Sequence, residues 1–333
     1  KRTIEEFYSK YQGDKNRPEW QQFEEYVKRF WFSNGVHHHY AEKKFVPNFP
    51  PDYLHHLAAE TPDLELPKKE EESNFEFLQR IEGYIFDKNL DAKKVVKDKG
   101  VDKVKASANN YYGDGVTEAE AIAHYAAMGT KGEKTPIEYG LNSRLVKKDG
   151  KLVDLVYKSG GLYSKAMEQM IYWLEKAEKV AENDAQAEHI GMLIEYFRTG
   201  DLKQWDATNI KWVNSTEGDI DFILGFIEVY GDAIGYKGAF EGIIQVNDKE
   251  ASKRMAVLSA NAQYFEDNSS ILDEHKKENV VGVSYRVINA AMEAGDAAPA
   301  TPIGVNLPNS NWIRSTHGSK SISLGNIVEA YNS

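Results

Sequence analysis

The amino-acid sequence predicts an α+β protein with a small, largely antiparallel sheet or barrel. Residues 141–160 contain two β-prone runs around Asp149-Gly150, the two-residue signal of a hairpin with a type I′ turn. Residues 162–183 carry apolar residues three to four positions apart, as an amphipathic helix does. Three further β-prone runs lie at 209–215, 222–230 and 240–247. Hairpins interleaved with helix pairs favour α+β over regularly alternating strands and helices.

Helices are predicted on both sides of the hairpin. Apolar spacing indicates a helix over 3–33, and 50–60 restarts a helix with two prolines at its first turn. Thr117, with Glu120 three positions later, has the arrangement of a capping box. The helix over 162–183 is expected to bury the stripe Leu162, Ala166, Met170, Trp173, Leu174, Ala177 and Val180.

The second half of the chain adds two more helical stretches. Residues 185–197 form a helix that ends near Gly200, because glycine favours the left-handed conformation of a helix C-terminus. A charged helical segment follows the last β-prone run, from about 249 to 275.

Composition narrows the class of partner. The chain has 333 residues, with 41 basic and 52 acidic side chains and a formal charge of −11. This excess argues against a nucleic-acid backbone and fits a neutral or cationic ligand, such as the ammonium end of a peptide. The absence of cysteine excludes disulfides and thiolate metal sites. No apolar run approaches the ~20 residues that span a bilayer, so no membrane partner is expected.

The nine histidines do not have the spacing of a complete metal site. His37-His38-His39 and His55-His56 are adjacent runs, whereas helical zinc pairs lie four positions apart with a glutamate between them. Hydrogen-bonded loop and helix-end histidines are the simpler interpretation. Nucleophile elbows and phosphate-binding glycine loops are also missing, and 235–242 is better explained as a loop between strands.

The run "GFIEVYGD" at 225–232 combines polar groups with a core-like strand. Residues two apart project from one face of a strand, so Glu228 and Tyr230 are expected to point the same way, in line with Phe226. A carboxylate and a phenol on such a strand need partners. Those partners belong either to a ligand or to a structural salt bridge and hydrogen bond.

A second run, at 301–326, is rich in amides. If Ile303 to Leu307 is an edge strand, its backbone can pair with an extended peptide. Asn306 and Asn309 can hydrogen-bond peptide groups without reading side chains, and Gly304 lets a ligand backbone approach. The alternative is an Asn-rich turn that caps its own backbone.

These runs resemble the dipeptidyl peptidase III family of zinc exopeptidases. The matching segments are "GFIEVYGD" (225–232), "GAFEG" (238–242), "GVNLPN" (304–309), "GSKSISLGN" (318–326), "KFVPNFP" (44–50) and "IKWV" (210–213). The similarity extends over most of the chain in order. The stretches "WFSNGVHHHY" and "LNSRLVKKDGK" look most like the bacterial, Bacteroides-type branch.

The resemblance implies a two-lobed fold around a wide cleft. This chain would be the N-terminal part, with residues 1–248 and 290–333 forming a substrate-binding lobe around a five-stranded β-barrel. Residues 249–289 would be a helical excursion into the zinc-carrying lobe. The family's zinc motif, His-Glu-x-x-Gly-His followed by Glu-Glu-x-x-Ala-Glu, would lie beyond Ser333. The resemblance therefore implies zinc in the full-length protein, none bound by this chain, and an inactive fragment.

The resemblance also implies roles for six residues. Glu228 matches the carboxylate that pairs with the substrate's α-ammonium, and Tyr230 matches the tyrosine that stabilises the developing oxyanion at the scissile carbonyl. The residues that would hold the peptide backbone are Gly304, Asn306 and Asn309, and Phe45 would lie near the pocket for the N-terminal side chain.

The expected function is therefore the release of dipeptides from the N-terminus of short peptides. Short peptides and the zinc-carrying lobe of the same protein are the expected partners. A non-catalytic peptide-binding module is the alternative, and a helical scaffold whose strands only pack is the third reading. The family is mostly cytosolic, which implies a cytoplasmic protein. The missing starting Met leaves a periplasmic or exported form open.

Overall fold

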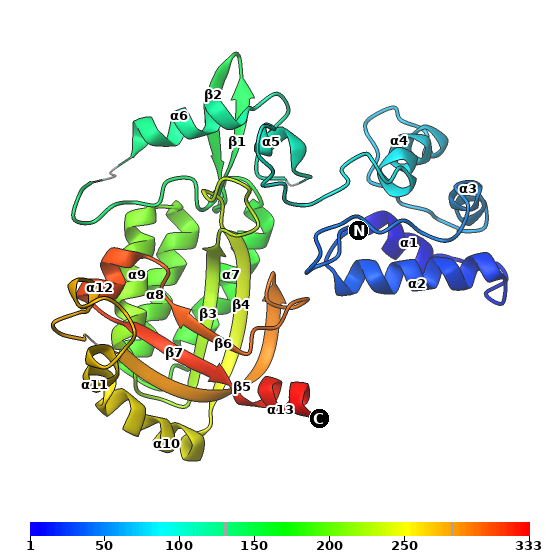
Figure 1. Ribbon diagram of the computed structural model, residues 1–333. Helices are drawn as coiled ribbons and strands as arrows, with labels where there is room; N and C mark the ends of the chain where they lie inside the picture. The colour runs from blue at the N-terminus through cyan, green and yellow to red at the C-terminus, as the bar shows by residue number, and fades with distance from the viewer. Residues whose placement is uncertain (109, 130–131, 281–282) are drawn as a thin grey trace. The chain divides into compact units, whose positions relative to one another are not determined.

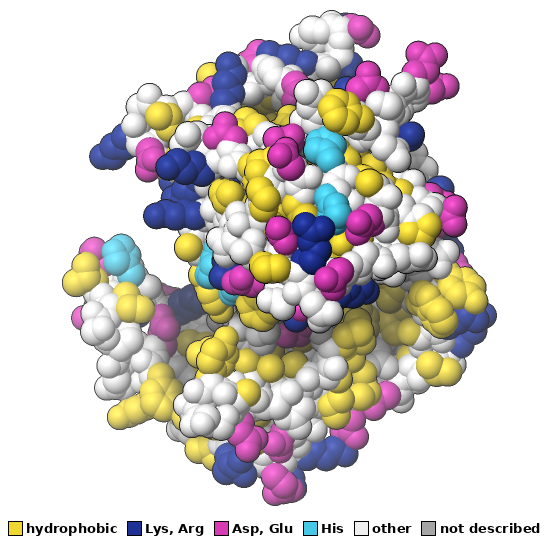
Figure 2. Space-filling model, turned by 90° about the vertical axis from the view of Figure 1, so that its right-hand side faces the viewer, with side chains coloured by type: hydrophobic (Ala, Val, Ile, Leu, Met, Phe, Trp, Pro, Cys, Tyr) yellow, Lys and Arg dark blue, Asp and Glu magenta, His cyan; other side chains and the backbone are white. Residues whose placement is uncertain are grey.

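The computed structural model describes residues 1–108, 110–129, 132–280 and 283–333. The chain divides into two compact units, Lys1–Asn109 and Asn110–Ser333, each with its own elements (Figure 1). No helix within the described ranges has the length and apolar character needed to cross a membrane. On the face shown in Figure 2, acidic and basic side chains are interspersed, so the net negative charge is not gathered there in one patch.

The first unit is helical. Its helices are α1 (Arg2–Lys10), α2 (Pro18–Phe32), α3 (Asp52–Ala59), α4 (Asn74–Phe86) and α5 (Lys103–Ala106). The single helix expected over 3–33 is thus two helices. The break falls before Pro18, which lacks a backbone N–H and is favoured at a first helical position. The helix expected after the paired prolines is confirmed as α3, with Pro51 as its N-cap.

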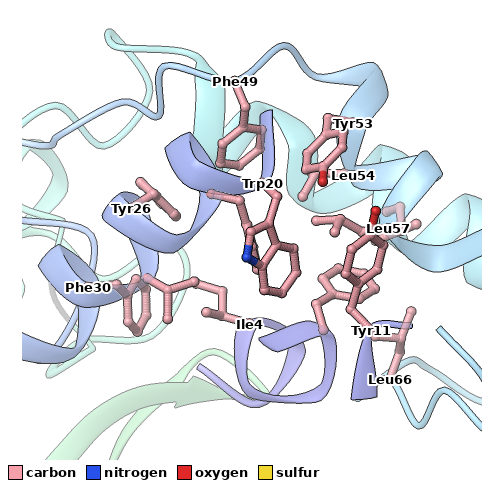
Figure 3. Packing of buried hydrophobic residues seen from close by; sticks show 14 of the residues in the cluster. Ile4, Tyr11, Trp20, Tyr26, Phe30, Phe49, Tyr53, Leu54, Leu57 and Leu66 are labelled. Carbon is pink, nitrogen blue, oxygen red and sulfur yellow. The ribbon is translucent and has the colours of Figure 1, made fainter. Parts of the chain in front are cut away.

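Aromatic side chains fill the core of the first unit. Trp20 stacks on Tyr11, with ring centroids 4.6 Å apart, and lies centrally among the labelled side chains of Figure 3. Phe23 meets Phe7 and Phe49 edge-on. Each aromatic ring buries a large apolar area, so a few such residues can form the core of a short helical unit.

The second unit combines helices with two sheets. Its elements are α6 (Glu118–Met128), β1 (Ser143–Lys148), β2 (Lys151–Val156), α7 (Ser164–Glu178), α8 (Asp184–Thr199), α9 (Leu202–Asn214), β3 (Ile220–Glu228), β4 (Ala239–Asn247), α10 (Lys249–Ala260), α11 (Ala262–Asp267), the 3-10 helix η1 (Asp273–His275), β5 (Val283–Gly295), β6 (Gly304–Leu307), α12 (Asn311–Thr316), β7 (Ser319–Leu324) and α13 (Gly325–Asn332).

The main sheet has five strands in the order β3-β4-β5-β7-β6. The pair β5–β7 is parallel and the other neighbours are antiparallel, so the sheet is mixed. The expectation of an antiparallel barrel is therefore wrong, although the α+β class is confirmed. Strand β6 has only four residues and pairs with β7. Within the described residues it makes no ladder with β3, so the sheet keeps two edges.

Three local predictions are confirmed. The hairpin is β1–β2, and Asp149 and Gly150 have the positive φ angles, 49° and 74°, that a type I′ turn requires. Thr117 and Glu120 form the capping box at the start of α6. Helix α8 ends at Gly200, which adopts the left-handed conformation with φ 70°.

The β-prone run at 209–215 is helical instead. It forms the end of α9, where Trp212 and Val213 are buried one turn beyond Thr208. The helical spacing of these residues with Trp205 places them on one face, and that packing outweighs the weak strand preference of single side chains.

Part of the stripe expected in the helix over 162–183 is wrong as well. Helix α7 buries Met167 and Ile171, whereas Trp173 is 63% exposed and Val180, beyond the helix end, is 80% exposed. Leu162, Met170, Leu174 and Ala177 do pack, partly buried, on the core. The buried face is therefore rotated from the predicted one.

Two apolar clusters support the main sheet. One joins α7, α8 and α9 to β3, and Phe226 and Trp205 are both buried in it. The other lies along β4, β5 and β7 and includes Ile243, Ile288 and Ile322. The charged segment over 249–275 is helical as expected. Residues 283–289 form the first part of β5, while 281 and 282 lie outside the described residues.

Candidate functional site

The C-terminal end of β3 carries the first candidate residue. Phe226 pairs with Phe240 and Glu228 pairs with Ala239, so Ile227 is an extra residue in a β-bulge. The bulge interrupts the alternation of faces, and the strand ends at Glu228. Phe226 is buried, whereas Tyr230 lies past the strand and is 53% exposed. The expectation that Phe226, Glu228 and Tyr230 lie in line on one strand face is therefore wrong.

Glu228 meets a side chain from the segment that follows β6. Asn309 Nδ2 donates a hydrogen bond to Glu228 Oε1 at 3.1 Å. Strands β3 and β6 are the two edge strands of the main sheet. The contact therefore joins the last residue of one edge strand to the segment that follows the other. The sequence-predicted carboxylate and one of the two predicted carboxamides thus lie at one place on the second unit.

Strand β6 is an edge strand, which is one of the two alternatives that the sequence left open for this run. It pairs on one side, with β7, within the part of the chain that the structure describes. Gly304 and Asn306 are exposed, while Leu307 is buried. The backbone carbonyl of Asn306 accepts a hydrogen bond from Arg314 Nη1 at 3.2 Å. Arg314 thus already engages one main-chain acceptor of this strand, and an extended peptide that bonded to the same carbonyl would have to displace it.

Tyr230 is held by a carboxylate that the sequence analysis did not identify. Its hydroxyl donates to Asp296 Oδ2 at 2.7 Å. Partial burial, and then this hydrogen bond, raise the pKa of Tyr230 above its ordinary value. The phenol therefore stays protonated at neutral pH and remains a hydrogen-bond donor.

Glu241, on β4, is the second residue that the sequence analysis missed as a site residue. It is 7% exposed, and burial, followed by the nearby Glu228 and Asp296, raises its pKa to about 8. It therefore holds its proton at neutral pH. Its position in "GAFEG" was the only signal in the sequence, and nothing in the sequence marked Asp296, which follows the end of β5.

A small hollow with both polar and apolar walls opens beside Asn309. It is lined by side chains of α8, α9, β3 and the segment after β6, among them Leu193, Trp205, Trp212, Phe222, Leu307 and Pro308. Asp206 lies at its wall, and burial raises the pKa of that carboxyl to about 7.

The model of peptidase family M49 matches residues 87–333. This chain belongs to peptidase family M49.

Individual M49 relatives are similar to parts of the chain. Human dipeptidyl peptidase 3 is 29% identical over 168 residues, which are 50% of this chain and 22% of the human protein. The structure of dipeptidyl-peptidase III from Corallococcus sp. strain EGB matches with a TM-score of 0.58 at 25% identity, covering 72% of this chain and 43% of that one.

A further structural match supports the fold alone. The structure of DPP III from Caldithrix abyssi has a TM-score of 0.57 at 22% identity, and the match covers 78% of this chain and 49% of that one. Each match covers less than half of the relative's length.

Phe45 lies in the first unit of the M49 chain. It is partly buried there against the aromatic core, and its ring meets Tyr26 edge-on at 5.7 Å. Its backbone N–H donates to the carbonyl of Val36. These contacts account for its packing within that unit. A role beside a ligand pocket stays a prediction.

The described residues do not fit the zinc ion that the family resemblance implies. Over the described ranges, no group of three or more His, Asp or Glu side chains is placed to hold a metal ion. The histidine run instead makes loop contacts: His37 Nε2 bonds with the Asp91 carbonyl at 2.7 Å, and His38 Nδ1 accepts from the backbone of Tyr40 and Ala41. No chemical step is therefore assigned to a metal held by these residues.

Proposed function

We propose that this M49 chain holds the substrate of a zinc-dependent dipeptidyl peptidase that releases dipeptides from the N-terminus of short peptides. The observation that carries the proposal is the hydrogen bond between Asn309 and Glu228 beside the open edge of β6. It joins the carboxylate that we propose as the ammonium acceptor to the amide that we propose to bind the peptide backbone. The names of the M49 relatives support the same activity.

The peptide is proposed to add to the sheet along β6. Its main chain would pair with the outer edge of β6, where Gly304 and Asn306 are exposed. The side-chain amides of Asn306 and Asn309 would bond to peptide N–H and C=O groups. Contacts of this kind read the backbone and leave side-chain identity free, which would suit broad specificity.

Glu228 is proposed to bind the peptide's free ammonium group. A charge-assisted hydrogen bond at this point fixes the distance from the N-terminus to the bond that is cut. Because Asn309 donates to the same carboxylate, the first residue of the peptide would be held by both side chains. Tyr230 is proposed to donate a hydrogen bond from its hydroxyl to the oxyanion that forms at the scissile carbonyl.

Zinc is proposed to be held by parts of the full-length protein other than the described residues, since these do not fit a metal site. A zinc ion would supply a polarised carbonyl and an activated water. Residues 249–289 are proposed to belong to the zinc-carrying lobe, which would be this chain's partner. On this proposal the chain alone binds peptides without cleaving them.

The experiment compares the full-length protein with this chain on a dipeptidyl arylamide reporter. We expect full-length protein to release the aryl group, a chelator to abolish release, and N-acetylation of the reporter to prevent it. The chain alone should bind the reporter without turnover. Binding by the full-length protein without any chelator-sensitive release would instead establish the non-catalytic peptide-binding module.

A further inference from the structure

The Tyr230 hydroxyl is already occupied in this structure. A phenol has one proton to donate, and Tyr230 donates it to Asp296 Oδ2 at 2.7 Å. A carboxylate is a stronger acceptor than a neutral peptide carbonyl. Tyr230 can therefore serve a substrate carbonyl only when its hydroxyl no longer donates to Asp296.

The backbone fixes Asp296 in this position. Gly295 has φ 67°, and a Cβ atom there would lie 2.0 Å from the carbonyl oxygen of Phe240. The N–H of Asp296 donates to that same carbonyl at 2.9 Å. Gly295 also pairs with Glu241 across β4 and β5. The contact with Tyr230 is thus built on two paired strands and not on a mobile side chain alone.

Three carboxyl groups act electrostatically on Tyr230, and one of them, Asp296, bonds to it directly. Glu228, Glu241 and Asp296 each raise the pKa of the phenol. Glu241 keeps its proton to about pH 8, because burial and the charges of the other two acids oppose its ionisation. A cation that enters this cluster relieves the repulsion, and a primary ammonium has three N–H donors to share between carboxylates.

The length of the hydrogen-bonded chain from an ammonium at Asp296 to a carbonyl at Tyr230 suits a dipeptide. Two residues of an extended peptide span about 7 Å. Hydrogen bonds from ammonium to Asp296, from Asp296 to Tyr230 and from Tyr230 to a carbonyl, each about 2.8 Å long, span up to about 8 Å end to end. A peptide whose ammonium reaches Asp296 thus brings the carbonyl of its second residue near the Tyr230 hydroxyl.

We propose that Asp296 is a second acceptor for the peptide's N-terminal ammonium, and that this exchange frees the Tyr230 hydroxyl for the scissile carbonyl. The inference rests on the proposed function and deepens it. Only hydrogen bonds change partners in this step. A free N-terminus would then be needed both for affinity and for release of the oxyanion donor.

The test uses full-length protein and a pair of identical peptides, one with a free and one with an acetylated N-terminus. Calorimetry on metal-stripped protein measures binding without cleavage. Asp296→Asn is expected to lower the free-to-acetylated affinity ratio about tenfold. Asp296→Glu, which keeps the carboxylate, should retain the ratio within about threefold. Glu217→Gln removes an exposed acid and should change nothing.

A second variant tests the exchange without altering Asp296. Tyr230→Phe removes a donor that competes for Asp296, so the affinity ratio should rise about threefold. An unchanged ratio in Asp296→Asn, or a lower ratio in Tyr230→Phe, overturns the inference. If wild-type protein shows no preference for the free amine, the proposed function itself fails. A wild-type preference that both variants retain refutes only the role of Asp296.

Discussion

Asn309 and Glu228 are 81 positions apart in the sequence, and a hydrogen bond of 3.1 Å joins their side chains. The two residues come from opposite edges of a sheet that is not closed into a barrel. The segment after β6 therefore reaches the end of β3 without a ladder between the strands. Strand β6 thus pairs with β7 alone among the described strands, while Asn309, two residues beyond its end, bonds to the carboxylate.

Glu228→Ala is expected to weaken peptide binding by roughly 1.5–3 kcal/mol, typical of a hydrogen bond to a charged group. Calorimetry with a short peptide measures the change. The N-acetylated peptide is the control, since it has no ammonium for Glu228 to bind and should lose little affinity. Equal losses for both peptides would argue that Glu228 only supports Asn309.

Tyr230→Phe should lower the turnover of the full-length protein about a hundredfold or more, as the loss of an oxyanion donor does. The phenyl ring keeps the packing, so the unfolding midpoint should stay near that of the wild type. Steady-state kinetics on a dipeptidyl arylamide gives kcat and KM separately. A change confined to KM would assign Tyr230 to ground-state binding instead.

The sequence predicted features that depend on a few neighbouring residues. The Asp149-Gly150 hairpin, the Thr117 capping box and the glycine at the end of α8 were confirmed because each is determined by local backbone preference. The strand predicted over 209–215 was wrong. Trp212 is buried by tertiary packing, and the run forms the end of α9.

The candidate site was predicted only in part for a similar reason. Glu228, Tyr230 and Asn309 lie in recognisable runs, whereas Asp296 reaches Tyr230 only through the pairing of β4 with β5. The bulge at Ile227 is likewise a property of the paired strands and has no signal in the sequence of β3 alone. The pairing of strands that are distant in sequence therefore determines which carboxyl groups lie close together.

Glu241→Gln is expected to stabilise the protein more at pH 8 than at pH 5. The folded pKa of Glu241 is raised to about 8 from an ordinary value of 4.5. Between these pH values the unfolded chain has lost the proton while the folded protein retains it, so wild-type stability falls as pH rises. The variant lacks this loss. The difference between its free energy of unfolding and that of the wild type should therefore grow by roughly 1–3 kcal/mol from pH 5 to pH 8.

Urea unfolding of both proteins at several pH values measures this difference. Glu217→Gln, at an exposed position, is the matched control and should show no growing advantage. An advantage for Glu241→Gln that stays constant from pH 5 to pH 8 would mean that Glu241 ionises normally in the folded protein.

Lys237 attaches the loop that carries Tyr230 to the rest of the second unit. Its side chain is fully buried, and Nζ donates to Ser143 Oγ at 3.0 Å, lies 3.4 Å from Asp154 Oδ1 and contacts the Tyr125 hydroxyl. In the same loop, Asp232 accepts the hydroxyl of Tyr112 at 2.7 Å. The loop between β3 and β4 is thus fastened to α6 and the β1–β2 hairpin.

Lys237→Met should lower the free energy of unfolding by about 2–4 kcal/mol, because it leaves the Asp154 carboxylate without its cation. The cost stays below that of an isolated buried charge, since His124, Tyr125 and Ser143 still bond to Asp154. Lys148→Met, on the exposed end of β1, should change stability by less than about 0.5 kcal/mol. Urea unfolding measures the stability of both variants. Equal free energies of unfolding would show that the buried ion pair of Lys237 and Asp154 does not stabilise the protein.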